Sequence, residues 1–139
     1  MMETIGVTGA SGHLGFNLCA DLIAQGYTVK GLYCKTSPPA TIKGVVWEQG
    51  DILQPGMVRD FVAGCDHIIH CAARISIRGG QEGLVWKTNV VGVKNILEAC
   101  LQEKVKRLIH VSSTHAVLER PGNQPFDETR PYKGENDFT

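Results

Sequence analysis

The sequence of 139 residues lacks the features that mark several large classes of protein. It has no uninterrupted apolar run of about 18 residues and no basic start before an apolar core, so neither a transmembrane helix nor a signal peptide is predicted. It also has no excess charge, because 14 Lys and Arg residues balance 14 Asp and Glu residues. We therefore expect a cytoplasmic protein with no nucleic-acid partner and no membrane partner.

The cysteines and histidines lack any metal-binding or disulfide pattern. The five cysteines are odd in number, scattered and never spaced as C-x-x-C, which favours reduced and mostly buried thiols. The five histidines show no H-E-x-x-H spacing. We predict no metal site.

What the sequence does contain is a regular alternation of strand and helix patterns. Short apolar runs typical of buried parallel strands occupy residues 4–8, 27–33, 45–47, 66–73 and 107–112. Helical spacing follows the first run up to Gly26, a short helix is expected from Pro55, and the longest helix pattern covers residues 82–103. Its apolar stripe is predicted from Trp86, Val90, Val93, Leu97 and Cys100. This alternation predicts a doubly wound α/β parallel sheet of strand order 3-2-1-4-5.

Three glycines, Gly9, Gly12 and Gly15, occupy the turn between the first strand and the first helix. Such a turn lets the backbone approach a pyrophosphate, and the positive end of the helix dipole attracts its charge. The spacing G-x-x-G-x-x-G, with no lysine after it, argues against a nucleoside triphosphate. Tight packing of the helix on the strand is the alternative reason for glycine here.

Five stretches in order resemble the extended short-chain dehydrogenase/reductases, also called the NAD-dependent epimerase/dehydratase family. They are TGASGHLG at 8–15, GDI at 50–52, HCAA at 70–73, TNVVGVKNILEAC at 88–100 and HVSST at 110–114. The resemblance implies an NAD(P)-binding Rossmann domain over residues 1–118, with a sheet incomplete on its C-terminal side. Residues 119–139 would be a polar loop leading to a catalytic and substrate-binding region absent from the sequence. The segment HVSSTHAV is most similar to the dihydroflavonol-reductase-like members.

The resemblance also assigns contacts to the cofactor. The pyrophosphate would lie against Gly9, Ser11, Gly12, His13, Leu14 and Gly15. Asp51 and Ile52 would meet the adenine, and Cys71, Ala72 and Ala73 would pass along the adjoining ribose and the nicotinamide. Asn89 would hold backbone geometry at the cofactor, with an ordinary cap or core hydrogen bond as the alternative.

Which nicotinamide cofactor is bound depends on the end of the second strand. The acidic residue that would grip the ribose hydroxyls of NAD, about 20 positions beyond the glycines, is missing. Lys35 and neighbouring hydroxyls stand there instead. We predict NADP(H), with NAD as the alternative.

Catalysis in the resembled family uses a Ser or Thr, a Tyr and a Lys. Thr114 lies where that hydroxyl is expected, with Ser113 as its neighbour, but no tyrosine here has a lysine four positions later. The chain is therefore expected to be the N-terminal portion of a longer reductase or epimerase, or else a non-catalytic sensor or interaction module. Its partner would be a small-molecule substrate, either a carbonyl compound or a nucleotide sugar.

Other residues have weaker assignments. Arg74 and Arg78 are candidates to face the substrate, although loop arginines are commonly solvated. His70 and His110 are expected to be satisfied core histidines rather than acid–base groups. The wide apolar stripe of residues 82–103 suggests a homodimer.

Overall fold

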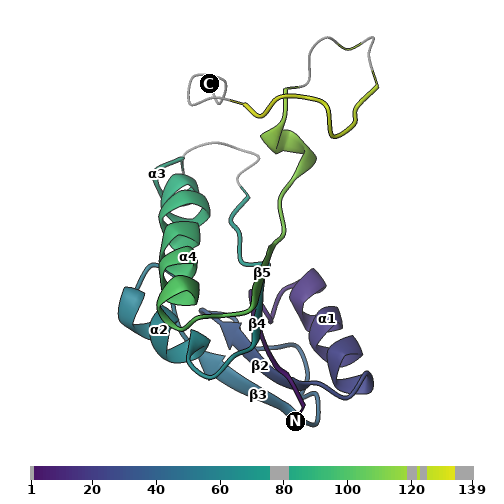
Figure 1. Ribbon diagram of the computed structural model, residues 1–139, viewed down its shortest axis with the longest axis vertical. Helices are drawn as coiled ribbons and strands as arrows, with labels where there is room; N and C mark the ends of the chain where they lie inside the picture. Colours follow the sequence, from purple (N-terminus) through teal and green to yellow (C-terminus); the bar gives the residue numbers. More distant parts are fainter. Residues whose placement is uncertain (1, 76–81, 119–121, 123–124, 134–139) are drawn as a thin grey trace.

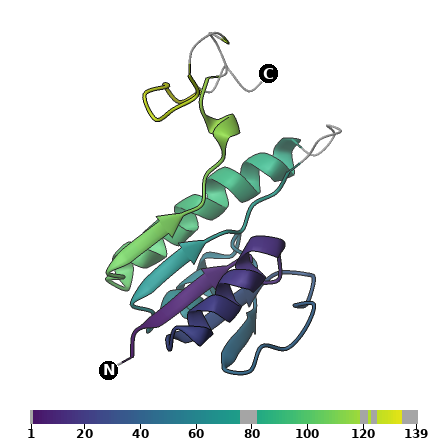
Figure 2. The ribbon, with the colours of Figure 1, turned by 90° about the vertical axis from the view of Figure 1, so that its right-hand side faces the viewer.

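Five parallel strands form one sheet in the order β3-β2-β1-β4-β5, which confirms the predicted strand order. The structure is a computed structural model that describes residues 2–75, 82–118, 122 and 125–133. The strands are β1 (Thr4–Thr8), β2 (Thr28–Tyr33), β3 (Val45–Gln49), β4 (His67–His70) and β5 (Arg107–His110). Because all of them run in the same direction, their carboxyl ends lie along one edge of the sheet (Figure 2).

Helices cover both faces of the sheet. Helix α1 (His13–Ala24) lies on one face, and α2 (Pro55–Val62) and α4 (Gly92–Gln102) lie together on the other (Figure 1). Successive side chains of a strand point to opposite faces, so Ile68 packs into the α2 and α4 core while Ile69 packs into the α1 core. The sheet is therefore buried between two apolar layers, as the apolar strands predict.

The long helix predicted over residues 82–103 is in three parts. Helix α3 (Glu82–Trp86) leads into a π-helical turn, η1 (Lys87–Val91), and only then into α4. A π turn takes more residues per turn than an α-helix, so it shifts the phase of the apolar stripe. The predicted stripe is accordingly wrong in part: Trp86 is 57% exposed and Leu97 is 45% exposed. The buried side of α4 consists of Gly92, Ile96, Ala99 and Cys100.

The fourth and fifth strands are shorter than predicted, since both end at a histidine. Strand β4 stops at His70 because the next N–H groups turn toward Thr8: Cys71 donates to its carbonyl and Ala72 to its hydroxyl, both at 3.2 Å. Beyond β5, a short 3-10 turn, η2 (Thr114–Ala116), leads to an antiparallel bridge between Val117 and Tyr132. The segment 125–133 thus pairs with residues 116–118, away from the sheet (Figure 1). The predicted boundary at residue 118 stays a prediction.

Candidate cofactor site

Two of the three motif glycines are required by packing inside the protein. Gly9 has a φ of +66°, and a Cβ added there would lie 2.8 Å from the Cα of Ala72. A Cβ on Gly15 would collide with the carbonyl oxygen of Gly9 and lie 2.9 Å from the Cα of Ala10. Gly9 is thus required by its positive φ and by the backbone that follows β4, and Gly15 by the packing of α1 on the glycine turn itself.

Gly12 is different, because packing within the described residues does not explain it. Its φ of −79° suits any residue, and an added Cβ would meet only the carbonyl oxygen of Gly9, at 3.2 Å. Gly12 is the N-cap of α1, with no side-chain cap and no acidic residue in the first turn. The first N–H groups of a helix have no acceptor within it, so this opening fits an anionic group such as a pyrophosphate.

The predicted pyrophosphate residues surround this opening. Ser11 is half-buried, whereas His13 and Leu14 in the first turn are exposed, and Gly15 is buried beneath them. The turn is fixed to the neighbouring strand because the N–H of Ala10 donates to the carbonyl of Leu32 at 3.0 Å. A ligand held by this turn would therefore lie at the carboxyl edge of the sheet.

The residues predicted to meet the adenosine lie at the ends of β2 and β3. Lys35 is exposed just beyond β2, and the two strand ends are joined because the N–H of Gly50 donates to the carbonyl of Tyr33 at 2.9 Å. The Asp51 carboxylate accepts the N–H of Leu53 at 2.9 Å. Ile52 is only 7% exposed, so its side chain belongs mainly to the core.

Buried hydrogen bonds of the Thr8 side chain connect the end of β1 to the end of β4, next to the glycine turn. Thr8 Oγ1 accepts the N–H of Ala72 and shares a hydrogen bond with His70 Nδ1 at 2.6 Å. Burial, together with the nearby His110, lowers the pKa of His70 to about 4, so the imidazole is neutral near pH 7. Within the described part of the chain, Nε2 of His70 is buried without a hydrogen-bond partner.

His70 is thus a core histidine as predicted, although only one of its nitrogens is satisfied. His110 is not: it is exposed, and its ring stacks on His70 with centroids 5.4 Å apart. The prediction for His110 is wrong because β5 is the edge strand of the sheet that the structure describes, so nothing there covers its side chain.

Asn89 holds the backbone just beyond β4. Its Oδ1 accepts the N–H of Arg74 at 2.8 Å, and its Nδ2 donates to the carbonyl of Arg74 at 2.9 Å. Asn89 lies in the π-helical turn, and such turns are frequent at functional sites. Of the three residues predicted to follow the ribose and the nicotinamide, Cys71 and Ala72 are half-buried and Ala73 is exposed.

The predicted catalytic hydroxyls lie beyond the end of β5. Ser113 caps the 3-10 turn, since its Oγ accepts the N–H of His115 at 3.2 Å, and Thr114 is exposed. No hydrogen bond among the described residues joins either one to the glycine turn. Arg78 lies outside the described residues.

Three further residues were not singled out by their sequence patterns. Thr8 makes the hydrogen bonds between β1 and β4 described above, and its position at the start of the glycine motif could have indicated this role. A Cβ on Gly92 would collide with the side chain of Ile52, and Asn95 Nδ2 donates to the carbonyl of Ile52 at 2.8 Å. Both belong to the stretch TNVVGVKNILEAC, in which only Asn89 was assigned a role.

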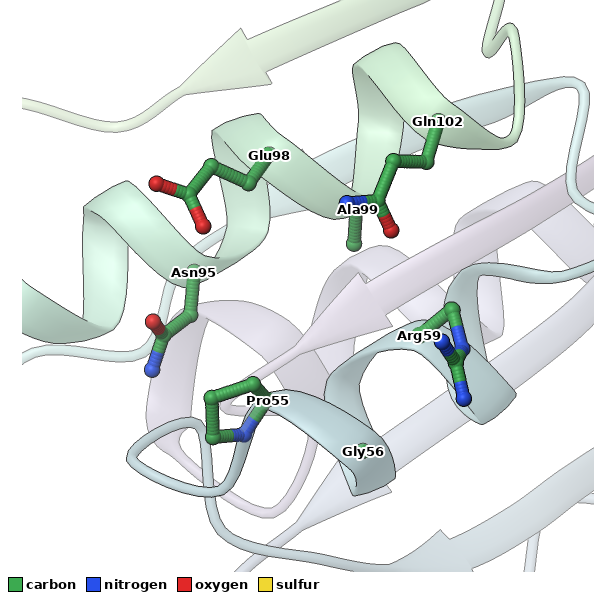
Figure 3. Close-up of a pocket in the computed structure, with 7 residues that line it drawn as sticks. All are labelled: Pro55, Gly56, Arg59, Asn95, Glu98, Ala99 and Gln102. Carbon is green, nitrogen blue, oxygen red and sulfur yellow. The ribbon is translucent and has the colours of Figure 1, made fainter.

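A separate pocket lies between α2 and α4 (Figure 3). It has a volume of about 270 Å³, and none of the predicted site residues lines it. Its lining consists of Pro55, Gly56, Arg59, Asn95, Glu98, Ala99 and Gln102. Among the residues that the structure describes, no group of three or more His, Cys, Asp or Glu side chains could hold a metal ion, and no helix is long and apolar enough to cross a bilayer.

A glycine turn at the carboxyl end of β1, opening on the N-terminus of α1, is the arrangement that binds dinucleotides. A sequence model of the NAD-dependent epimerase/dehydratase family matches residues 5–138. The chain belongs to this family. This agrees with the resemblance carried by the five sequence stretches.

Two curated relatives match most of this chain. Sterol demethylase protein B of Methylococcus capsulatus is 36% identical over 117 residues, which cover 83% of this chain and 36% of that protein. A dihydroflavonol 4-reductase-like protein of Synechocystis is 30% identical over 131 residues, covering 93% of this chain and 38% of that protein. The chain thus spans little more than a third of the length of these relatives.

A solved structure shows the same fold with a cofactor. The complex of a uronate dehydrogenase variant from Agrobacterium tumefaciens with NAD matches with a TM-score of 0.72 and 28% identity. The match covers 84% of this chain and 43% of that one.

Proposed function

We propose that this chain forms the cofactor-binding portion of an NADP(H)-dependent oxidoreductase that transfers hydride between the nicotinamide and a carbonyl or alcohol substrate. The observation that carries the proposal is the opening at Gly12, where a Cβ would meet little protein and the N-terminus of α1 is uncapped. Family membership and the reductase among the relatives support the same reaction class.

The choice of NADP(H) depends on charge at the end of β2. Lys35 is exposed there, followed by Thr36 and Ser37, whereas a carboxylate that would repel a 2′-phosphate is missing from this stretch. We expect tighter binding of NADP(H) than of NAD(H), and a titration with both cofactors tests this. Tighter NAD(H) binding would contradict it.

In this proposal the bound cofactor supplies the hydride, and the chain supplies position and hydrogen bonds. The glycine turn and the first turn of α1 hold the pyrophosphate, Asp51 and Ile52 flank the adenine, and residues 71–73 follow the ribose. Thr114 donates a hydrogen bond to the reacting oxygen, with Ser113 as the second candidate. No proton donor is assigned within the described residues.

Gly12→Ala is the direct test of the cofactor site. The added methyl group occupies the opening at a φ that suits any residue, and its 3.2 Å contact with the Gly9 carbonyl oxygen requires only a small shift of the turn. We therefore expect dinucleotide affinity to fall about 10-fold or more with only a small loss of thermal stability. Gly56→Ala is the matched control, because Gly56 lies in α2 with open space around its Cβ position. Equal binding by the wild type and Gly12→Ala, measured by calorimetry, would refute the proposed site.

Two other activities remain as alternatives. A nucleotide-sugar epimerase or dehydratase would use the same cofactor site, and a non-catalytic NAD(P)-binding sensor would bind without turnover. Epimerisation and dehydration return the hydride to the substrate and consume no NADPH, so NADPH oxidation with carbonyl compounds detects only the reductase, and analysis of the products formed from nucleotide sugars detects the epimerase or dehydratase. Turnover of nucleotide sugars alone would select the epimerase.

We also propose that the protein is cytoplasmic and forms a homodimer through α3 and α4. The five cysteines are free, and burial raises the pKa of both Cys19 and Cys65 to about 11, as suits unreactive reduced thiols. Trp86 and Leu97 are exposed apolar side chains on these helices. Leu97→Glu is therefore expected to shift the mass measured by light scattering from dimer to monomer, and an unchanged mass would contradict this interface.

A further inference from the structure

Two buried polar side chains, Thr8 and His70, face each other at the carboxyl ends of β1 and β4. The two residues are partners in the parallel register, and their exposed fractions are 0% and 1%. Thr8 Oγ1 and His70 Nδ1 lie 2.6 Å apart, which is hydrogen-bond distance. Polar groups buried this deeply cost stability unless they are paired, so the bond holds both side chains in place.

The Thr8 hydroxyl also fixes the chain that follows β4. It accepts the N–H of Ala72 at 3.2 Å, while the Thr8 carbonyl accepts the N–H of Cys71 at 3.2 Å. The residue after Thr8 is Gly9, where an added Cβ would lie 2.8 Å from the backbone nitrogen of Ala72. One hydroxyl group therefore helps to set the separation between the glycine turn and residues 71–73.

The His70 imidazole fixes the orientation of that hydroxyl. A threonine side chain has three staggered rotamers, and the bond to Nδ1 holds Thr8 in one of them. The ring itself is buried and stacks on His110, with centroids 5.4 Å apart. Burial, together with His110, lowers the pKa of His70 to about 4, so the neutral ring and its bond to Thr8 persist at neutral pH.

Stability alone does not account for a histidine at position 70. Within the described residues, its Nε2 is buried without a hydrogen-bond partner, and an unpaired buried nitrogen costs free energy. The preceding strand residues, Ile68 and Ile69, are apolar and belong to the two cores. An apolar ring at position 70 would avoid the unpaired nitrogen, but it would leave the Thr8 hydroxyl without this bond.

We propose that His70 is a positioning residue for the cofactor: acting through Thr8, it holds residues 71–73 at the distance from the glycine turn that the nicotinamide end of the dinucleotide requires. The inference rests on the proposed cofactor site, in which the pyrophosphate lies at the turn and residues 71–73 follow the ribose and the nicotinamide. A ligand that spans both edges binds more tightly when their separation is fixed before it arrives. The adenosine end, at β2 and β3, does not depend on this separation.

The test is calorimetric titration of the whole chain with NADP⁺ and with adenosine 2′,5′-bisphosphate, a probe that has the adenosine end but no nicotinamide. If the wild type prefers NAD⁺, the pair of ligands is NAD⁺ and AMP. His70→Phe keeps a ring and removes the bond to Thr8. We expect it to weaken binding of the dinucleotide about 3-fold to 10-fold, the range for one neutral hydrogen bond, and to leave binding of the adenosine probe unchanged.

Three further variants at histidines complete the series. His70→Gln places its amide near the position of Nε2 rather than Nδ1, so it should behave as His70→Phe does and replaces it if the phenylalanine variant does not fold. His70→Asn can restore the bond to Thr8 and is expected to recover most of the loss. His67→Gln, at the opposite end of β4, is the control and should bind both ligands as the wild type does.

Thr8→Val separates action through Thr8 from a general effect on the core. Valine has the shape of threonine without the hydroxyl, so the effect of His70→Phe on dinucleotide affinity should disappear in the Thr8→Val background. Additive losses in the double variant would mean that His70 acts by another route, and they would overturn the inference.

The remaining outcomes are equally distinct. Wild-type affinity for the dinucleotide in His70→Phe and His70→Gln overturns the inference and leaves the proposed function standing. Equal losses for the dinucleotide and the adenosine probe also overturn it, because they indicate a general effect on the fold. A wild-type chain that binds no dinucleotide overturns the proposed function and the inference together.

Discussion

Buried His70 should make the stability of this protein depend on pH in a defined acidic window. The folded state lowers the pKa of His70 from an ordinary value of 6.5 to about 4, chiefly by desolvation and secondarily through the charge of His110. As the pH falls, the unfolded chain therefore takes up a proton before the folded chain does. The free energy of unfolding should be unaffected above about pH 7 and fall between 6.5 and 4.

The magnitude follows from the two pKa values. Each pH unit between them corresponds to about 1.4 kcal/mol, so His70 should cost about 2 kcal/mol of stability at pH 5 and about 3 kcal/mol at pH 4. This is a large fraction of the total stability of a small domain, which is about 5–15 kcal/mol. The carboxylates of Glu3 and Asp66 add a loss of stability at lower pH, because hydrogen bonds from Lys106 lower their pKa values from ordinary values of 4.5 and 3.8.

His70→Asn isolates the contribution of the imidazole. The asparagine amide can replace the Nδ1 bond to Thr8 but does not titrate, so the stability lost between pH 7 and pH 5 should be about 2 kcal/mol smaller than in the wild type. His115→Gln removes an exposed imidazole and serves as the control. Urea unfolding at each pH gives the free energies. The same acid loss in His70→Asn and the wild type would refute the reasoning.

Three further substitutions test contacts described by the structure. Lys30→Met removes a 2.6 Å hydrogen bond from Nζ to the carbonyl of Phe61 at the end of α2. It should lower the free energy of unfolding, measured in urea, by about 1–3 kcal/mol. An unchanged urea midpoint would contradict this. Gly15→Ala should cost about 1–3 kcal/mol in the same assay, because its Cβ collides with the carbonyl oxygen of Gly9, and it should cost more than Gly12→Ala, whose Cβ lies 3.2 Å from the same oxygen. Asn89→Ala should weaken dinucleotide binding while leaving the melting temperature near wild type, and loss of both together would assign it a purely structural role.

Local pattern was sufficient for most of the architecture. Alternating strand and helix segments predict parallel pairing, and the short helix begins at Pro55 as predicted. These features depend on interactions between residues close in sequence, so they can be predicted from hydrophobic periodicity and turn residues. The π-helical turn at 87–91 has no comparable signal, and the hydrogen bond that its Asn89 accepts comes from Arg74, 15 residues away in sequence.

The glycine turn shows where sequence information ends. The spacing of Gly9, Gly12 and Gly15 indicates a close approach of something to the backbone, but it does not distinguish protein from ligand. Only the tertiary structure shows that protein atoms occupy the space of a side chain at Gly9 and Gly15, whereas at Gly12 an added Cβ would meet only the carbonyl oxygen of Gly9. The bond between Thr8 and His70 joins residues separated by 62 positions, so it too exists only once β1 and β4 are paired. Local interactions determine which segments form strands and helices, whereas the placement of a site depends on which strand ends the folded sheet brings together.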